Sequence, residues 1–377
     1  MKIGIVCYPT FGGSGVVATE LGMALADNGH EVHFITYNQP VRLDFLSHKL
    51  HFHQVLIEEY PLFQYQPYEL ALSSKMVEVV EKHELEVLHV HYAIPHAYAA
   101  FMAKQMLLEK GISIKVVTTL HGTDITLVGS HPTYKTAVEF SINNSDVVTA
   151  VSNSLKQTTN HLFKIKKEIQ VVYNFIDIEK YDKAENQECK RDALAKPNER
   201  ILTHISNFRP VKRVEDVIKI FYEVQKEIPS KLLMIGEGPD RAKAEILTKK
   251  LGITDNVFYL GNSTETVKIL CYTDLFLLPS QTESFGLAAL EAMAAKTAVI
   301  STNTGGLPEV NIQGKTGFLS DLGDIKDMAK NAISILKEDA ILDQFKRNAK
   351  EHTKKFSLQN ILPVYEEIYN SCYKTKV

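Results

Sequence analysis

Two glutamates eight residues apart frame the string ESFGLAALE, Glu283 to Glu291, which follows an apolar run and Pro279. If the string is helical, the two carboxylates are separated by about 12 Å at 1.5 Å per residue. That distance resembles the gap between the two sugar rings of a nucleoside diphosphate sugar. We expect a helix to begin around 284–286, so that its free amides meet a phosphate between the two sugars. Alone this spacing is weak evidence for a ligand site, because paired glutamates on a helix are usually solvated.

Cations are concentrated where a predicted strand passes into a helix. The string ISNFRPVKR, 205–213, contains Arg209, Lys212 and Arg213. Arginine offers a planar fork of donors and lysine a mobile point charge, a combination suited to a diphosphate. Solvated surface charge is the alternative.

A glycine-rich loop follows the first predicted strand. Gly12, Gly13 and Gly15 lack Cβ atoms where a ligand can approach the backbone, and the next helix points its free amides at that space. The loop therefore predicts a seat for an anion or polar ligand, with a tight turn as the alternative. The spacing G-G-S-G does not fit a dinucleotide fingerprint, no acidic residue follows the second strand, and no P-loop motif is present.

Composition limits the class of protein. A chain of 377 residues predicts two domains, and a net charge of −3 argues against a nucleic-acid or anionic-membrane binder. The four cysteines are far apart, which favours neither a zinc knuckle nor a disulfide framework. No apolar run reaches the roughly 18 residues of a membrane span. We expect a soluble, cytoplasmic protein.

Short β-branched runs alternate with helical patterns along most of the chain, which predicts an α/β fold of doubly wound parallel sheets. In the first half the predicted strands are 3–7, 32–36, 52–56, 87–90, 116–120 and 147–151, and the predicted helices are 14–28, 70–83, 97–108 and 134–143. Gly29 is expected to end the first helix. In the second half the predicted strands are 201–205, 232–235, 257–260, 275–278 and 298–301.

The polar segment 177–200 is typical of a linker or surface excursion between two domains. We expect an acceptor-binding domain over 1–175 and a nucleotide-sugar-binding domain over 176–357. An amphipathic segment at about 358–377 is able to pack back on the first domain.

Taken together, the glycine loop, the cations and the E-x7-E motif with Phe285-Gly286 resemble the retaining glycosyltransferases of the GT-B fold, family 4, over essentially the whole chain. The resemblance implies two Rossmann-like domains with the active site in the cleft between them. More narrowly, the sequence is similar to family members that transfer N-acetylglucosamine from UDP-N-acetylglucosamine to the hydroxyl of L-malate, the first step in making the low-molecular-weight thiol bacillithiol. The strings that carry this likeness are CYPTFGGSGVVATELG, HVHYAIPHAYAAFMAKQM, TTLHGTDITLVG, SNFRPVKRVEDVI and TESFGLAALEAM.

The resemblance assigns donor contacts by position. It implies Glu291 on the ribose, Glu283 on the hexose, and Arg209 and Lys212 on the diphosphate. Main-chain amides near Gly13, Phe285, Gly286 and Leu287 would join the diphosphate, and Asn262 and Ser263 would lie near the uracil. One departure is that the family often has arginine five positions before the lysine, where this chain has Asn207.

His121, in the string LHGTD, corresponds to a histidine that the family places near the transferred sugar, with Asp124 orienting the segment. The front-face mechanism favoured for this class needs no enzyme nucleophile, because the departing β-phosphate receives the acceptor proton. Double displacement through an enzyme carboxylate is the competing mechanism.

A metal reading of His89, His91 and His96 is disfavoured, because no acidic or cysteine ligand is close by in the sequence. Polar packing at a strand end is the favoured interpretation. The family also implies no bound metal or other cofactor for the transfer.

Acceptor residues are the hardest to predict. The two carboxylates of malate need donors in the first domain, and Arg42 is the only arginine before Arg191. Other candidate donors on strand-end loops are Ser14, Tyr65, Tyr92, Thr119 and Asn153.

Three rival functions stay open. One is a family 4 enzyme with another small or lipid acceptor, another is a UDP-N-acetylglucosamine epimerase or hydrolase, and the third is a two-lobed ligand-binding protein. The expected partners are the two substrates, with no nucleic acid and no membrane, and the chain is compatible with a homodimer or higher homo-oligomer.

Overall fold

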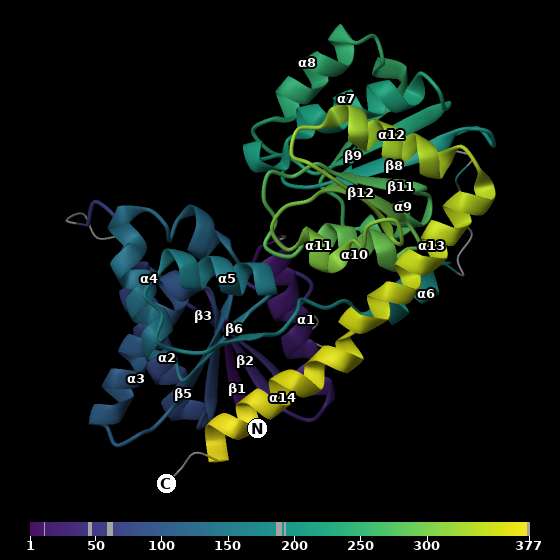
Figure 1. Cartoon of the computed structure of the whole chain (residues 1–377). Helices are drawn as coiled ribbons and strands as arrows, with labels where there is room; N and C mark the ends of the chain where they lie inside the picture. The colour runs from purple at the N-terminus through teal and green to yellow at the C-terminus, as the bar shows by residue number, and fades with distance from the viewer. Residues whose placement is uncertain (11, 44–46, 59–62, 186–190, 192–193, 375–377) are drawn as a thin grey trace. The chain divides into compact units, whose positions relative to one another are not determined.

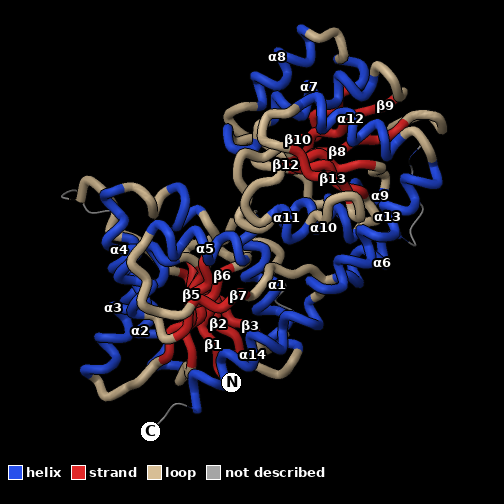
Figure 2. Tube along the Cα trace, in the orientation of Figure 1, coloured by secondary structure: helices blue, strands red, loops and turns tan. Residues whose placement is uncertain are grey.

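Two parallel β-sheets organise the chain, each with its own helices (Figure 2). The computed structural model describes residues 1–10, 12–43, 47–58, 63–185, 191 and 194–374. It divides into two units, one formed by Met1–Asn174 with Gln359–Val377 and the other by Phe175–Leu358. No helix in the described part of the chain is long and apolar enough to cross a membrane.

The sheet of the first unit has seven strands in the order β3-β2-β1-β4-β5-β6-β7. Their bounds are β1 Lys2–Val6, β2 Glu31–Thr36, β3 Leu50–Gln54, β4 Val87–His91, β5 Lys115–Leu120, β6 Val147–Ala150 and β7 Ile169–Val171. The helices are α1 Gly13–Asp27, α2 Tyr68–His83, α3 Tyr98–Glu109, α4 Pro132–Asn144, α5 Asn153–Leu162 and the C-terminal α14 Leu358–Lys374 (Figure 1). Short turns at Ala93–Ala97 and Thr123–Leu127 follow β4 and β5.

Strand alternation decides which helices cover each face of this sheet. Val6, Ile35 and Leu88 share one buried cluster with the apolar residues of α2 and α3. On the other face a Cβ on Gly22 of α1 would lie 2.4 Å from the Phe34 ring, so α1 packs closely on β2. The α14 helix covers the same unit, because the Tyr369 hydroxyl lies 2.7 Å from His89 Nδ1.

The sheet of the second unit has six strands in the order β10-β9-β8-β11-β12-β13. Their bounds are β8 Arg200–Ile205, β9 Ser230–Ile235, β10 Val257–Gly261, β11 Leu275–Leu278, β12 Ala298–Thr302 and β13 Gly317–Ser320. The helices are α6 Ile178–Glu185, α7 Val214–Gln225, α8 Arg241–Lys250, α9 Thr266–Cys271, α10 Leu287–Ala294, α11 Leu307–Val310, α12 Ile325–Leu336 and α13 Asp339–Thr353. A core of Leu, Ile, Val and Phe side chains joins α7 and α12 to one face of the sheet.

Every strand predicted from the sequence lies within two residues of an observed strand. Gly29 follows α1 with a φ of +97°, as expected of a residue that ends a helix. The sequence reading missed the short edge strands β7 and β13, and it did not foresee that α6 lies within the polar segment 177–200.

Candidate functional site

The helix after β11 begins later than the sequence indicated. Gly286 is the N-cap of α10 with a φ of +102°, and the first helical residue is Leu287. A Cβ on Gly286 would lie 2.7 Å from a methyl group of Leu307, so the close approach of α11 and the left-handed backbone both require glycine here. Glu283 therefore lies in the loop before the helix, and the helical separation of about 12 Å between Glu283 and Glu291 does not apply.

Glu283 is held in this loop by its own backbone. Its carbonyl accepts a hydrogen bond of 2.8 Å from the amide of Gly306. A Cβ on Gly305 would lie 2.1 Å from the same carbonyl, so only glycine allows this approach. The position of the glutamate is thus fixed by the loop after β12 as well as by its own segment.

The side chain of Glu283 is paired with the predicted phosphate-binding lysine. Lys212 Nζ lies 2.6 Å from Glu283 Oε1, and the side chains are 21% and 14% exposed. The Ser280 hydroxyl donates a second hydrogen bond of 2.8 Å to the same oxygen. An ion pair that is partly shielded from water is stronger than a surface pair. The structure therefore brings together two residues that the sequence placed on different parts of a ligand.

A buried histidine supports the loop after β8. His204 Nδ1 donates to the carbonyl of Leu277, and its Nε2 lies 2.7 Å from the Ser206 hydroxyl. Burial lowers the pKa of His204 to about 4, so the ring is neutral at pH 7. The amide of Gln281 donates to the carbonyl of Val211, which ties the lysine segment to the loop that carries Glu283.

The two neighbouring arginines differ in their surroundings. Arg213 is ion-paired with Asp216 at the start of α7. Arg209 is exposed at the N-cap of a short turn, Pro210–Lys212, and forms no ion pair with any described residue. Arg209 is therefore available to an anionic ligand, whereas the Arg213 guanidinium is engaged by Asp216.

The remaining predicted donor contacts are distributed around the same end of the second sheet. Asn262 is exposed and Ser263 half-buried directly after β10, where the Ser263 hydroxyl accepts from the amide of Glu265. Phe285 is buried against Phe356 and directly precedes Gly286, the N-cap of α10. Glu291 lies within α10 and is half-buried.

In the first unit, the glycine loop forms the N-terminus of α1. Gly12 is the N-cap and offers no side chain to the free amides, and Gly13 is the exposed first residue of the helix. A Cβ on Gly15 would lie 2.5 Å from the carbonyl oxygens of both Tyr8 and Thr10. Gly15 is thus required by close backbone packing, while Gly13 is at the N-terminal end of α1, where helix amides can meet an anion.

Two predicted acceptor residues meet beside this helix. The Ser14 hydroxyl lies 2.6 Å from the Tyr92 hydroxyl, although the residues are 78 positions apart. The Tyr92 ring lies 5.2 Å from the ring of His121, whose Nε2 is 2.8 Å from His91 Nδ1. Burial lowers the pKa of His121 to about 3, so this histidine is a neutral hydrogen-bonding group.

Asp124 organises the backbone around His121. Its carboxylate accepts hydrogen bonds from the amides of Ala93, Gly122 and His121, at 2.8, 2.9 and 3.3 Å. Burial raises the pKa of Asp124 to about 6, against the opposite effect of these donors. The carboxylate joins the turns after β4 and β5, which fits the orienting role that the sequence assigned to it.

The other acceptor candidates occupy different environments. Thr119 does not lie on a strand-end loop as expected, because it is within β5, is 1% exposed and bonds His89 and Thr149. Arg42 follows β2 and pairs with Glu20 of α1 at 3.2 Å. Asn153 begins α5 and donates to the Tyr173 hydroxyl, and Tyr65 is 82% exposed.

His89, His91 and His96, for which the sequence disfavours a metal site, are buried. His89 bonds Thr119 and Tyr369, and His96 Nδ1 donates to the carbonyl of His91. The Nε2 atoms of His91 and His96 are buried without a partner among the described residues. Their placement links the strand end to α14 and to the turn after β4.

Sequence reasoning missed the groups that hold Glu283. Ser280 and the pair Gly305-Gly306 fix its side chain and carbonyl, respectively. The only signal for them was the string TNTGG after a predicted strand, since two adjacent glycines at a strand end indicate close backbone approach.

Comparison with known proteins agrees with this arrangement. The model for the Glycosyltransferase Family 4 matches residues 11–180, and the model described as Glycosyl transferases group 1 matches residues 185–352. The chain belongs to this family of sugar-nucleotide-dependent glycosyltransferases, with two Rossmann-like domains of the GT-B fold.

A particular enzyme is similar over nearly the full length. The chain is 48% identical over 370 residues to the N-acetyl-alpha-D-glucosaminyl L-malate synthase of Bacillus anthracis, covering 98% of this chain and 96% of that one. Among solved structures, sucrose-phosphate synthase of Thermosynechococcus elongatus matches with a TM-score of 0.81 at 19% identity over the whole of both chains. HepE of Anabaena in complex with UDP matches with a TM-score of 0.77 at 17% identity, covering 98% and 99% of the two chains.

Proposed function

We propose that this protein transfers N-acetylglucosamine from UDP-N-acetylglucosamine to the hydroxyl of L-malate, with retention at the anomeric carbon. The observation that carries the proposal is the 48% identity, over 98% of the chain, to an enzyme named for that product. The charged groups at the end of the second sheet support the donor half of the reaction, and the hydroxyl pair beside α1 supports the acceptor half.

The donor contacts follow from charge and position. Lys212 and the exposed Arg209 bind the diphosphate, joined by main-chain amides at Gly13 and at Phe285 to Leu287. Glu283 accepts hydrogen bonds from the hexose and Glu291 from the ribose. Asn262 and Ser263 line the uracil.

The ion pair between Lys212 and Glu283 holds both side chains in place before the donor binds. Before the donor binds, the carboxylate neutralises the lysine and holds its side chain, so little rotamer entropy remains to be lost. When the diphosphate arrives, Lys212 gains a second anionic partner while Glu283 turns a free oxygen to the sugar hydroxyls.

The transfer exchanges one bond for another at the anomeric carbon. The bond to the β-phosphate oxygen breaks, and the bond to the malate hydroxyl oxygen forms on the same face of the sugar. The malate proton passes to the departing phosphate oxygen, and UDP leaves. Lys212, Arg209 and the α10 amides stabilise the charge that develops on that phosphate, which is usually the largest catalytic contribution.

Acceptor recognition is assigned to the first unit. Ser14 and Tyr92 supply a bonded hydroxyl pair for the malate hydroxyl or a carboxylate, and Arg42 supplies a cation. Tyr65 and Asn153 are further donors, whereas the buried bonds of Thr119 favour a structural role for it. His121 contacts the transferred sugar as a neutral hydrogen-bonding group.

UDP release measured by a coupled assay, with and without L-malate, tests the proposal. Malate-dependent release and an α-linked product by NMR are expected. Succinate is the matched control, because it keeps both carboxylates and lacks the hydroxyl, and it should give no transfer. UDP release at the same rate with and without malate would indicate hydrolysis or epimerisation. No UDP release in the presence of malate would mean that the enzyme uses another donor or acceptor.

The proposal also covers the cellular location, the cofactors and the partners of the enzyme. We place it in the cytoplasm, acting without a bound metal for the transfer itself and without nucleic-acid or membrane partners. A homodimer or higher homo-oligomer is compatible with this function.

A further inference from the structure

A cluster of histidines lies on one face of the first sheet. His33 is on β2, and His51 and His53 are on the neighbouring strand β3. The parallel register pairs His33 with His51 and Ile35 with His53, so alternation puts all three imidazoles on the same face. The α2 helix covers this face and ends at His83, which brings a fourth imidazole to the group.

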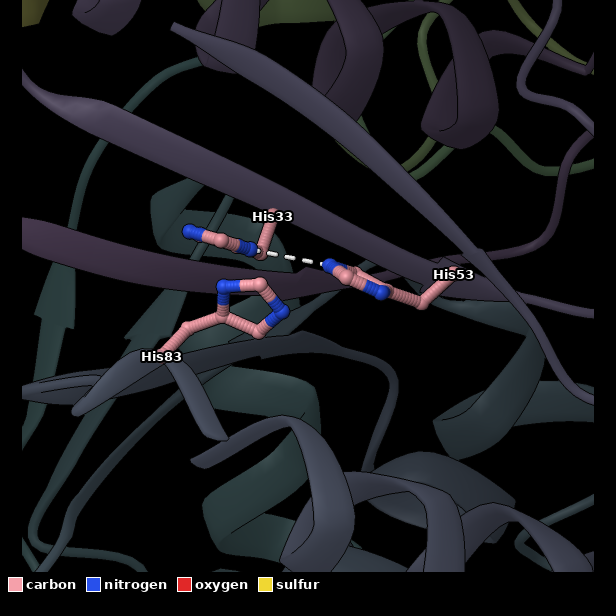
Figure 3. Close-up of side chains that lie close together, drawn as sticks. All are labelled: His33, His53 and His83. Atoms are coloured by element: carbon pink, nitrogen blue, oxygen red, sulfur yellow. Dashed lines mark hydrogen bonds between the residues drawn. The ribbon is translucent and has the colours of Figure 1, made fainter. Parts of the chain in front are cut away.

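The rings are close enough to share an ion. His33 Nδ1 lies 2.9 Å from His53 Nε2, and the His83 ring centroid is 4.6 Å from that of His33 and 5.0 Å from that of His53. One ring nitrogen from each of the three lies within 4.8 Å of the others. Figure 3 shows the three imidazoles converging from two strands and the end of a helix.

Hydrogen bonds within the protein do not satisfy this cluster. His83 Nε2 is buried and has no hydrogen-bond partner among the described residues. A buried polar atom without a partner costs about 1–3 kcal/mol. His33 is fully buried, so water does not reach the centre of the group from its side. A ligand in this space would supply the missing interaction.

Glu31 orients the central histidine. Its Oε1 lies 3.1 Å from His33 Nε2 and 3.4 Å from His51 Nε2. When His33 Nε2–H donates to this carboxylate, the lone pair of Nδ1 points at the space shared with His53 and His83. Histidine ligands of metals are commonly held in this way by a carboxylate on the far nitrogen.

We propose that His33, His53 and His83 form a binding site for a divalent transition-metal ion of the Zn²⁺ type, with Glu31 as a positioning residue. At Zn–N distances of about 2.0–2.1 Å, tetrahedral geometry separates ligand nitrogens by about 3.3 Å. In this structure the distances between the ligand nitrogens of the three histidines range from 2.9 Å to at most 4.8 Å, so 3.3 Å lies within that range. Three imidazoles leave the fourth position to solvent, and imidazole suits this class of ion.

A hollow in the surface lies beside Glu31. This hollow of about 380 Å³ is lined by Met1, Lys2, Gly29, Glu31, Glu84 and Glu86. Its three carboxylates favour the approach of a cation, and Lys2 offsets part of that charge through its contact with Glu84 at 3.4 Å. Glu31 belongs both to this hollow and to the histidine cluster.

The proposed ion has a structural role, distinct from the transfer reaction. His33 precedes Thr36, the last residue of β2, by three positions, whereas ligands of parallel sheets bind beyond the carboxyl ends of the strands. A bound ion would join the edge strand β3 to β2 and to the end of α2. Binding to the folded state alone would raise its stability.

The test uses the full chain without a polyhistidine tag, stripped of metal by a chelator and titrated with Zn²⁺ in a calorimeter. One ion per chain and a higher melting temperature with Zn²⁺ are expected. His83→Gln and His53→Gln should each weaken binding at least about 100-fold, and Glu31→Gln about 10- to 100-fold. His161→Gln, at an exposed position on α5, is the matched control and should bind as the wild type does.

Cobalt substitution of the wild-type chain keeps the test decisive if a variant fails to fold. Tetrahedral d–d absorption without a thiolate charge-transfer band is the expected spectrum. The proposal is wrong if wild-type protein binds no Zn²⁺, if His83→Gln binds it equally well, or if a charge-transfer band shows that a cysteine is the ligand.

Discussion

Lys212 and Glu283, 71 residues apart in the chain, form an ion pair of 2.6 Å at the end of the second sheet. The same carboxylate oxygen also accepts from Ser280, and its backbone is held by Gly306. The pair joins the segment after β8 to the loop before α10, so each residue depends on the other for its orientation.

Replacing either member of this pair should impair catalysis. Lys212→Gln is expected to lower kcat/KM about 100- to 1,000-fold, because a preorganised charge at the departing phosphate is lost. In a double-mutant cycle with Glu283→Gln, the two effects should be non-additive by about 0.5–3 kcal/mol. Lys226→Gln, which removes an exposed pair with Glu223 on the same unit, is the control. Strict additivity would contradict a functional coupling of Lys212 and Glu283.

The hydroxyl pair beside α1 should affect the acceptor more than the donor. Tyr92→Phe removes the hydroxyl that lies 2.6 Å from the Ser14 hydroxyl and leaves the half-buried ring in place. We expect the KM for L-malate to rise about tenfold, the loss of one hydrogen bond to a charged group, with the KM for UDP-N-acetylglucosamine unchanged. Tyr98→Phe at an exposed position is the control. An effect on the donor KM alone would argue against an acceptor role.

Gly15 should tolerate no side chain. Gly15→Ala brings a Cβ within 2.5 Å of two backbone carbonyls and should lower the free energy of unfolding by about 1–3 kcal/mol. In Gly12→Ala the nearest atom is the Thr10 hydroxyl at 3.4 Å, so a smaller loss is expected. Urea unfolding of the two variants measures the difference. Equal stability would show that the loop relaxes to accommodate the methyl group.

Buried neutral histidines should make the fold sensitive to acid. Burial lowers the pKa of His89 and His121 to about 3 and of His96 and His204 to about 4, below their unfolded value of about 6.5. Between pH 4 and 6.5 the unfolded chain therefore binds more protons at these sites, and stability falls as the pH falls through this window. Asp124 acts in the opposite sense, because its folded pKa of about 6 exceeds its unfolded value, so its contribution to stability is lost as the pH rises from about 4 to 6.

At pH 5 these five groups together contribute a net uptake of about three protons on unfolding, a slope of about 4 kcal/mol per pH unit, and the lowered pKa values of His33, His53 and His91 add to it. Urea unfolding at pH 7, 6 and 5 in the presence of a chelator measures this slope. His204→Asn should reduce it by about one proton, and the exposed control His161→Gln should leave it unchanged. A slope near zero would mean that the buried imidazoles do not protonate on unfolding.

Local sequence determined the elements, their order and the chemical character of the site. The β-branched runs of β1, β5 and β12 and the cations around Arg209 are readable because strand alternation, helix period and charge are properties of short segments. The edge strands β7, IQV, and β13, GFLS, each contain only two hydrophobic residues, which are too few to give such a signal. The glycines at 12–15 indicated a loop, although only the packed structure identifies Gly15 as the one in close contact with backbone carbonyls.

Tertiary structure alone decided which residues meet. Lys212 and Glu283, Ser14 and Tyr92, and the three histidines of β2, β3 and α2 are brought together by strand order and register, which no local pattern encodes. The same holds for the start of α10, where the close approach of Leu307 and a left-handed backbone both require glycine at position 286, and Glu283 lies outside the helix. The sequence therefore supplied the chemical groups, whereas the distances among them depend on packing between segments far apart in the chain, which is a property of the whole fold.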